Sequence, residues 1–194
     1  EQDIVKLASN ENPLGISPLA KKAIERSLID IERYPDGNGF YLKKAISKKY
    51  KLQSSEIILG NGSNDVLELV ARTFLSKDDE AIFSEHAFAV YPLVVQAVGA
   101  KGIEVPAVNF AHNLDGFQKA ITNKTKVIFI ANPNNPTGTL IGKTEIKNFL
   151  NFSQIYQKTK ITRLEQNYRS TENILSTASK LISFNISSLV LWIL

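Results

Sequence analysis

The sequence predicts an α/β fold: a mostly parallel sheet with helices on both faces, truncated and followed by a helical tail. Short apolar runs of strand length alternate with longer segments whose apolar residues recur at helical spacing. Clusters of turn residues separate these segments, and strands that alternate with helices form parallel sheets. The chain of 194 residues is 43% hydrophobic, which is enough for one large domain with its own core.

Helices and strands follow one another in order along the chain. The first helix is expected to begin at Pro18, after Ser17 as N-cap, because proline suits a first turn. Pro92 is tolerable in a later helix for the same reason. We expect helices at 18–32, 40–50, 65–75, 89–98, 114–121 and 143–150, and strands at 56–59, 81–84, 101–107 and 126–132.

A glycine-rich loop, GNGSND at 60–65, joins a predicted strand to a helix. Gly60 and Gly62 permit positive φ angles and a close approach of the backbone. Ser63 or Asn64 can cap the helix, whose free N–H groups favour an anion, typically phosphate. The alternative is a capped turn between a strand and a helix, with no ligand.

The loop NPNNPTG, at 132–138, follows the most apolar predicted strand. Pro133 and Pro136 fix φ and restrict the residue before each of them. The asparagine amides are then held in a rigid loop where they can donate to a ligand oxygen. A purely structural turn is an equal alternative, since Asn, Pro and Gly all favour turns. Both unusual loops lie at carboxyl ends of predicted strands, where α/β sheets bind ligands.

Five segments carry a resemblance to a known family. Together they resemble the histidinol-phosphate aminotransferases, which are fold type I enzymes that use pyridoxal 5'-phosphate. The resemblance covers residues 1 to about 151 and implies a partial cofactor-binding large domain. It also implies transfer of an amino group between histidinol phosphate and 2-oxoglutarate, in cytoplasmic histidine biosynthesis. The segments are KLASNENPLG (6–15), RYPDGNG (33–39), LGNGSNDVLELVARTFL (59–75), HAFAVYPLVVQAVGA (86–100) and NPNNPTGT (132–139).

The resemblance assigns cofactor-binding roles to individual positions. Gly62, Ser63 and Asn64 match the loop that holds the cofactor phosphate. Phe88 matches the aromatic residue that stacks on the pyridine ring, although a core phenylalanine is the plain alternative. Asn135 matches the amide that binds the phenolic oxygen of the cofactor.

Other matches concern the substrate and a second subunit. Tyr34 matches a tyrosine that reaches the phosphate in the neighbouring subunit, so the resemblance implies a homodimer. Asn10 and Asn12 match the arm near the substrate. His86 and Tyr91 are interpreted as structural residues.

The catalytic residues of the family have no counterpart in this sequence. The family uses a Schiff-base lysine and an aspartate beside the pyridine nitrogen, both beyond NPNNPTG. No aspartate follows Asp115, and Lys180 lies in TASKLISF, which is typical of an amphipathic helix. We therefore assign no catalytic residue and expect the chain as given to be inactive.

The tail from residue 152 is of a different kind. Its segment TRLEQNYRSTENILSTASKLI, at 162–182, resembles a motif of UvrD-type superfamily-1 helicases. In that motif the tyrosine matching Tyr168 stacks on adenine, and the arginine matching Arg169 contacts a phosphate of ATP. The chain has no GxxxxGK[ST] loop, so ATP hydrolysis is not expected. A solvated helix capped by Thr171 is the alternative.

We accordingly expect two parts, a partial aminotransferase domain at 1–151 and an unrelated helicase-like helical tail with an apolar end at 152–194. A nonfunctional fusion product and a nucleotide- or DNA-binding fragment are the alternatives to an aminotransferase.

Composition narrows the classes of partner and site. The absence of cysteine excludes disulfides and thiolate chemistry, and two histidines are too few for a metal cluster. No apolar stretch approaches the ~20 residues that span a bilayer, and the start lacks the pattern of a signal peptide. The net charge of +4 is unevenly placed, with +1 through Asn151 and +3 from Phe152 onward, but this asymmetry is too small to indicate nucleic acid. The expected partners are small-molecule substrates and a second copy of the chain, with no membrane and no nucleic acid.

Overall fold

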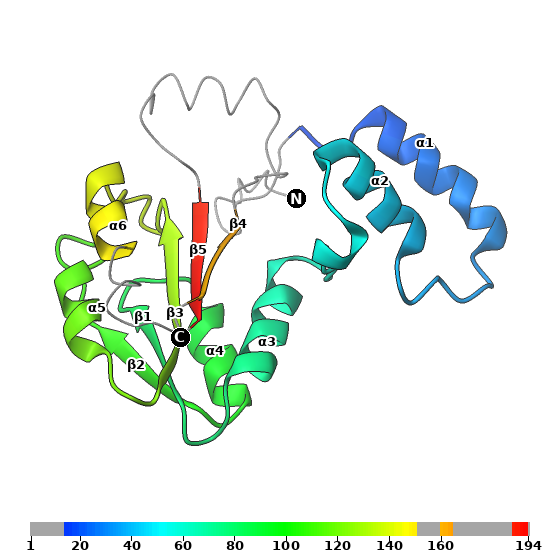
Figure 1. Ribbon diagram of the computed structural model, residues 1–194. Helices are drawn as coiled ribbons and strands as arrows, with labels where there is room; N and C mark the ends of the chain where they lie inside the picture. The colour runs from blue at the N-terminus through cyan, green and yellow to red at the C-terminus, as the bar shows by residue number, and fades with distance from the viewer. Residues whose placement is uncertain (1–13, 151–159, 165–187, 194) are drawn as a thin grey trace, which may run out of the picture. The chain divides into compact units, whose positions relative to one another are not determined.

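The computed structural model describes residues 14–150, 160–164 and 188–193 (Figure 1). The chain divides into two compact units, Glu1–Leu59 and Gly60–Leu194. Within the described ranges, no helix is both long enough and apolar enough to cross a membrane.

Helices make up the described part of the first unit. The helix expected at 18–32 is shorter than predicted, because its last part continues as a 3-10 turn. The helix expected at 40–50 is confirmed, and the Asp36 carboxylate accepts hydrogen bonds from the Asn38 and Phe40 amides beside its start (3.0 and 2.6 Å). The elements are α1 (Pro18–Ser27), η1 (Leu28–Asp30), α2 (Phe40–Tyr50) and η2 (Ser54–Glu56).

The strand predicted at 56–59 is wrong. A 3-10 turn occupies Ser54–Glu56, and the segment after it is extended but pairs with no strand of the described chain. Ile57 is buried whereas Ile58 is 75% exposed. An apolar run becomes a strand only where another strand supplies hydrogen-bond partners, and that partner is a non-local feature that the run does not encode.

A five-stranded sheet organises the second unit, in the order β2-β1-β3-β5-β4. β1 is parallel to both β2 and β3, as the alternation of elements predicted. The predicted helices and strands between residues 65 and 150 are confirmed with small changes at their ends. The elements are α3 (Ser63–Phe74), β1 (Glu80–Ser84), α4 (Val90–Ala97), β2 (Lys101–Val105), α5 (Leu114–Ala120), β3 (Thr125–Asn132), α6 (Lys143–Leu150), β4 (Lys160–Leu164) and β5 (Ser188–Ile193).

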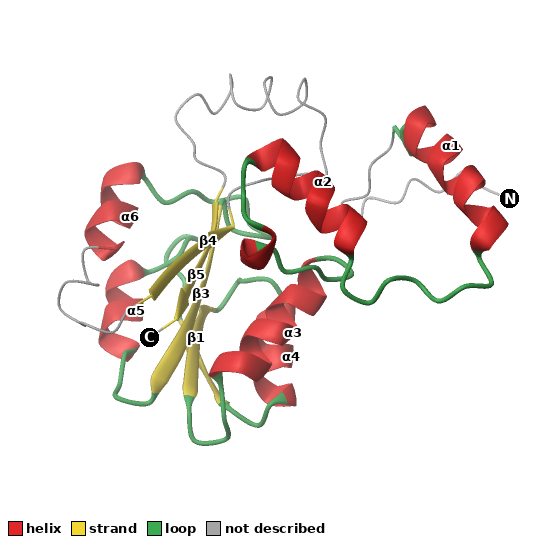
Figure 2. Ribbon diagram, turned by 45° about the vertical axis from the view of Figure 1, so that its right-hand side comes forward, coloured by secondary structure: helices red, strands yellow, loops and turns green. Residues whose placement is uncertain are grey.

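Helices cover both faces of the parallel strands (Figure 2). On one face Phe83 and Phe129 pack in a cluster with side chains of α3 and α4. On the other face Ile82 and Ile128 pack with side chains of α5 and α6. Successive residues of a strand point to opposite faces, so burial on both faces explains why β1 and β3 are apolar without alternation.

The expected helical tail differs from the structure at 160–164 and 188–193, which are strands. β5 pairs antiparallel with β3, from Asn132 opposite Ser188 to Val127 opposite Ile193, and β4 pairs antiparallel with β5. The free edge of β3 offers unpaired backbone groups, and the apolar, partly β-branched run SLVLWI satisfies them. The boundary expected at residue 151 stays a prediction. Tyr168, Arg169, Thr171 and Lys180 lie outside the described residues.

Candidate functional site

The candidate site lies at the carboxyl edge of the parallel strands. β1 and β3 run in the same direction, so the loops that follow Ser84 and Asn132 leave the sheet at the same edge. α3 packs on one face of the sheet and leads directly into β1, so its C-terminus lies near the start of β1 and its N-terminus lies towards the carboxyl edge (Figure 1). The sheet therefore gathers three of the predicted segments: the 60–65 loop, the residues after β1 and NPNNPTG.

Two of the three asparagines in NPNNPTG hold the loop together. The Asn132 side chain donates to the Ile141 carbonyl (3.1 Å) and accepts from the Ile141 amide (2.7 Å), which closes the loop at its base. The Asn134 amide nitrogen Nδ2 donates to the His86 carbonyl (2.8 Å) and to Thr137 Oγ1 (2.9 Å). Both asparagines are buried. The loop after β3 is thereby tied to the loop after β1.

Asn135 differs from its two neighbours. Its side chain is exposed, and it makes no hydrogen bond to any residue in the described part of the chain. Its donors and acceptor are therefore available to a ligand at the carboxyl edge. The structural interpretation of the loop holds for Asn132 and Asn134, which build the turn. The role of Asn135 in ligand binding stays a prediction.

The residue at the N-cap of α3 differs from the one that the sequence predicts. Gly62 is the N-cap of α3, with φ 84°, and no side chain caps the helix. The expectation that Ser63 or Asn64 caps α3 is therefore wrong, because the positive φ of Gly62 starts the helix one residue earlier. Both residues are exposed in the first turn, where backbone N–H groups lack intrahelical acceptors.

A carboxylate at the same turn opposes anion binding. Asp65 Oδ2 accepts from the backbone amide of Asn61 (2.8 Å) and from its side-chain amide (3.0 Å). These two bonds hold the glycine loop in place. The negative charge of Asp65 lowers the positive potential of the helix N-terminus. Phosphate binding at this turn stays a prediction, and a bound anion would have to overcome this repulsion.

Phe88 is half-buried beside the core of the α3–α4 face. Its ring meets Tyr91 edge to face, with centroids 5.9 Å apart and an interplanar angle of 88°. Tyr91 in turn stacks on Phe129 at 4.7 Å. Burial raises the pKa of the Tyr91 phenol well above its ordinary value, so Tyr91 remains neutral. Tyr91 thus supports Phe88 from the core, in agreement with its structural interpretation.

Three predicted site residues are not brought to this edge by the described contacts. Tyr34 belongs to the first unit, where its side chain is fully exposed. Asn10 and Asn12 lie outside the described residues. Their assignments to substrate and to a second subunit stay predictions.

Sequence reasoning missed the residues that position the site. Asn134 is the main example: it is adjacent to Asn135 and identical in type, so local pattern does not separate the buried amide from the exposed one, and only the family resemblance pointed to Asn135. Ser84, the last residue of β1, was also not singled out. Its hydroxyl is buried and has no hydrogen-bond partner among the described residues.

Most of this chain matches a known protein family. The family model for aminotransferase class I and II matches residues 2–159. The chain is 60% identical over 149 residues to histidinol-phosphate aminotransferase 1 of Idiomarina loihiensis, which covers 77% of this chain and 41% of that protein. It is 57% identical over 149 residues to histidinol-phosphate aminotransferase 2 of Pasteurella multocida, with the same coverage of 77% and 41%. The chain thus spans about two-fifths of the length of these curated relatives.

Solved structures show the same fold. A histidinol-phosphate aminotransferase from Sinorhizobium meliloti, in complex with pyridoxal-5'-phosphate, matches with a TM-score of 0.66 and 22% identity, covering 73% of this chain and 39% of that one. An aromatic aminotransferase from Pyrococcus horikoshii matches with a TM-score of 0.67 and 26% identity, covering 80% and 44%. The arrangement of α3–α6 around β1–β3 is therefore similar to part of an aminotransferase fold.

Proposed function

The chain belongs to the aminotransferase class I and II family, and from this premise we propose that its second unit carries the cofactor-holding part of a histidinol-phosphate aminotransferase. The cofactor is pyridoxal 5'-phosphate. The single observation that carries the proposal is the free amide of Asn135, presented at the carboxyl edge by a loop whose other asparagines are buried.

The residues at the edge fit the chemistry of this cofactor. The cofactor has a phosphate, a flat aromatic ring and a phenolic oxygen. The uncapped first turn of α3 offers N–H groups and the hydroxyl of Ser63 to the phosphate. Phe88 offers a half-buried ring to the aromatic system, and Asn135 offers an amide donor to the phenolic oxygen. When bound, pyridoxal phosphate acts as an electron sink for carbanion chemistry at the substrate.

Residues of this chain hold Asn135 and Phe88 in a fixed position and orientation. Asn134 fixes the backbone of the loop against the carbonyl of His86, and this sets where the neighbouring Asn135 lies. The Phe88 ring is held edge-on by Tyr91, so its orientation is set by the core. Rigid supports of this kind reduce the ordering cost of binding, because the contacting groups are already in place.

The reaction proposed for the whole enzyme is transfer of an amino group between histidinol phosphate and 2-oxoglutarate, in the cytoplasm and as a homodimer. The similarity to relatives named histidinol-phosphate aminotransferase supports the reaction, whereas the location and the homodimer are implied only by the resemblance of the sequence. For this chain we propose cofactor binding without turnover, since the sequence offers no counterpart to the catalytic lysine. The role of 162–182 as a nucleotide- or DNA-binding segment stays a prediction from sequence alone.

Replacing Asn135 with Ala tests the assignment of the loop. We expect the dissociation constant for pyridoxal phosphate to rise about two- to tenfold, because one hydrogen bond contributes roughly 0.5–1.5 kcal/mol. Titration followed by visible circular dichroism of the bound cofactor measures it. Asn123→Ala is the matched control, since Asn123 is also exposed but precedes the opposite end of β3. Equal affinities for the two variants would contradict the proposal.

A further inference from the structure

A tight turn at residues 108–111 follows β2, which is parallel to β1, so the turn lies at the carboxyl edge of the sheet. The Val108 and Ala111 amides each donate to the other residue's carbonyl (3.1 and 2.9 Å). The two central residues, Asn109 and Phe110, have φ angles of 51° and 62°. Turns with positive φ at both central positions favour Asn followed by Gly, so Asn109 fits and Phe110 does not. A bulky residue in this conformation is strained, and the strain persists only where its surroundings hold it.

The contacts of the Phe110 ring lie at the surface and not in the core. The ring is 65% exposed and meets the half-buried His86 ring, with centroids 5.2 Å apart and an interplanar angle of 32°. Burial therefore does not explain why phenylalanine occupies a strained position. His86 follows β1 and lies two residues before Phe88. The ring contact joins the turn after β2 to the loop after β1.

The carbonyl of Phe110 ends a chain of hydrogen bonds that begins in NPNNPTG. Thr139 Oγ1 lies 3.0 Å from the Phe110 carbonyl oxygen and 2.8 Å from Thr137 Oγ1. A carbonyl only accepts, so the Thr139 hydroxyl donates its one proton to Phe110 and accepts from Thr137. Thr137 Oγ1 in turn accepts from Asn134 Nδ2 (2.9 Å). Every bond of the chain thus has one direction, and bonds arranged in this way polarise one another.

These contacts join three loops in a closed network. Asn134 Nδ2 also donates to the His86 carbonyl (2.8 Å), and the His86 ring meets Phe110. The loop after β1, the turn after β2 and the loop after β3 are each connected to the other two. Phe88 and Asn135, which are proposed to contact the cofactor, lie within two residues of members of this network. A change in the network is therefore expected to reach them.

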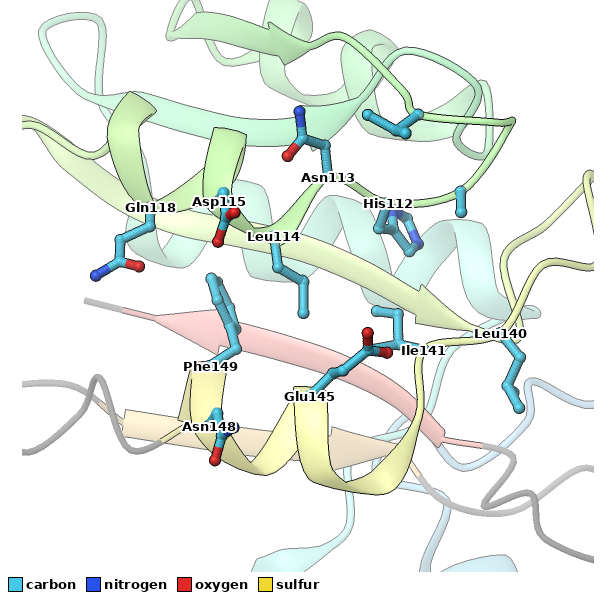
Figure 3. A pocket seen from close by; sticks show the side chains of 12 residues that line it. His112, Asn113, Leu114, Asp115, Gln118, Leu140, Ile141, Glu145, Asn148 and Phe149 are labelled. Carbon is cyan, nitrogen blue, oxygen red and sulfur yellow. The ribbon is translucent and has the colours of Figure 1, made fainter.

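A cavity of about 670 Å³ lies between the turn and the segment that follows Thr139 (Figure 3). Val108 and Ala111 line it together with Leu140 and Ile141. Close-packed side chains would fix the two segments to each other, but this space separates parts of them. The bond from Thr139 and the contact between the two rings consequently matter more for the position of the loop.

We propose that Phe110 and Thr139 are positioning residues for the cofactor: they hold NPNNPTG against the strained turn and thereby orient Asn135. This inference rests on the proposed function, because both residues act through groups assigned there to the cofactor. It also accounts for the strain, since glycine would relax the turn but would remove the ring that meets His86. Neither Phe110 nor Thr139 needs to touch the cofactor.

Hydrogen exchange of the chain without cofactor tests whether the turn orders the loop. The Asn134 amide donates to the Thr139 carbonyl and the Gly138 amide donates to the Asn134 carbonyl, both at 2.8 Å. The exchange rates of these two amides therefore report on the order of the loop. We expect Phe110→Gly and Thr139→Val each to raise both rates about three- to tenfold, the usual effect of losing one such contact. The rates in β1 should stay unchanged.

Asn109→Gly is the matched control for these variants. It removes an exposed side chain from the same turn and accepts the positive φ, but it keeps the Phe110 ring and the bond from Thr139. We expect it to leave the exchange rates of Asn134 and Gly138 at their wild-type values. Unchanged rates in either Phe110→Gly or Thr139→Val, or an equal rise in Asn109→Gly, would overturn the proposal.

Titration with pyridoxal phosphate, followed by visible circular dichroism, tests positioning. Phe110→Gly and Thr139→Val should each raise the dissociation constant about two- to tenfold, and no further than Asn135→Ala does. Neither should weaken binding further when Asn135 is already Ala. Thr139→Ser keeps the hydroxyl and should retain the wild-type affinity. Losses that persist in full beside Asn135→Ala would show that the two residues do not act by orienting Asn135.

Failure of this inference and failure of the proposed function give different results. A wild-type chain that binds no pyridoxal phosphate would contradict the proposed function, and the exchange rates would still decide whether the turn orders the loop. A chain whose affinity falls in Asn135→Ala but not in Phe110→Gly would support the proposed function and overturn the role of the turn.

Discussion

Replacing Phe129 with Ala is expected to lower the free energy of unfolding by about 3–5 kcal/mol, which is the usual cost of removing a buried phenylalanine. Phe129 is 1% exposed in the middle of β3. Its ring stacks on Tyr91 at 4.7 Å with an interplanar angle of 10°. Its loss leaves a cavity between the sheet and α4, and it removes the support beneath Tyr91 and Phe88.

Urea denaturation followed by circular dichroism measures this loss. Phe110→Ala is the matched control, because Phe110 is 65% exposed in the same unit. We expect that control to change the free energy of unfolding by less than about 1 kcal/mol. Similar small losses in both variants would mean that β3 is not packed between two helical layers in solution.

Asn134→Ala is expected to weaken both folding and cofactor binding. The change removes the donor to the His86 carbonyl and to Thr137 Oγ1, at a cost of roughly 1–3 kcal/mol in the free energy of unfolding. It also releases the loop that presents Asn135. The affinity for pyridoxal phosphate should therefore fall at least as far as in Asn135→Ala, although Asn134 itself is buried.

A double-mutant cycle separates positioning from simple destabilisation. If Asn134 acts through Asn135, Asn134→Ala should cost little further affinity when Asn135 is already Ala. Binding is measured at a temperature where every variant is folded by circular dichroism. Fully additive losses of affinity would show that Asn134 does not act by orienting its neighbour, and unchanged affinity in Asn134→Ala would assign it a structural role only.

The sequence predicts a strand or helix correctly where the local pattern agrees with the tertiary environment. The apolar run at 126–132 is a strand because both of its faces meet a core cluster, and the stripe at 65–75 is α3 because its apolar face meets the core. The run at 56–59 has the same local character and is not a strand, since pairing depends on residues far away in the chain. The antiparallel addition of β5 to β3 is non-local in the same way.

The sequence predicts where the candidate site lies but not which of its side chains form hydrogen bonds with one another. Proline and glycine indicated where the loops turn, and parallel topology indicated that they share an edge. The distinction between Asn134 and Asn135 depends on which amide faces the His86 carbonyl, a tertiary contact over 48 residues of sequence.

The central claim is that this chain holds pyridoxal phosphate through the first turn of α3, Phe88 and Asn135 without a dedicated lysine. The most direct test is to incubate the chain with pyridoxal phosphate, reduce with borohydride and map the modified lysines by peptide mass spectrometry. We predict that the label is spread thinly over several lysines and that histidinol phosphate protects none of them. A single lysine labelled stoichiometrically and protected by histidinol phosphate would contradict the claim.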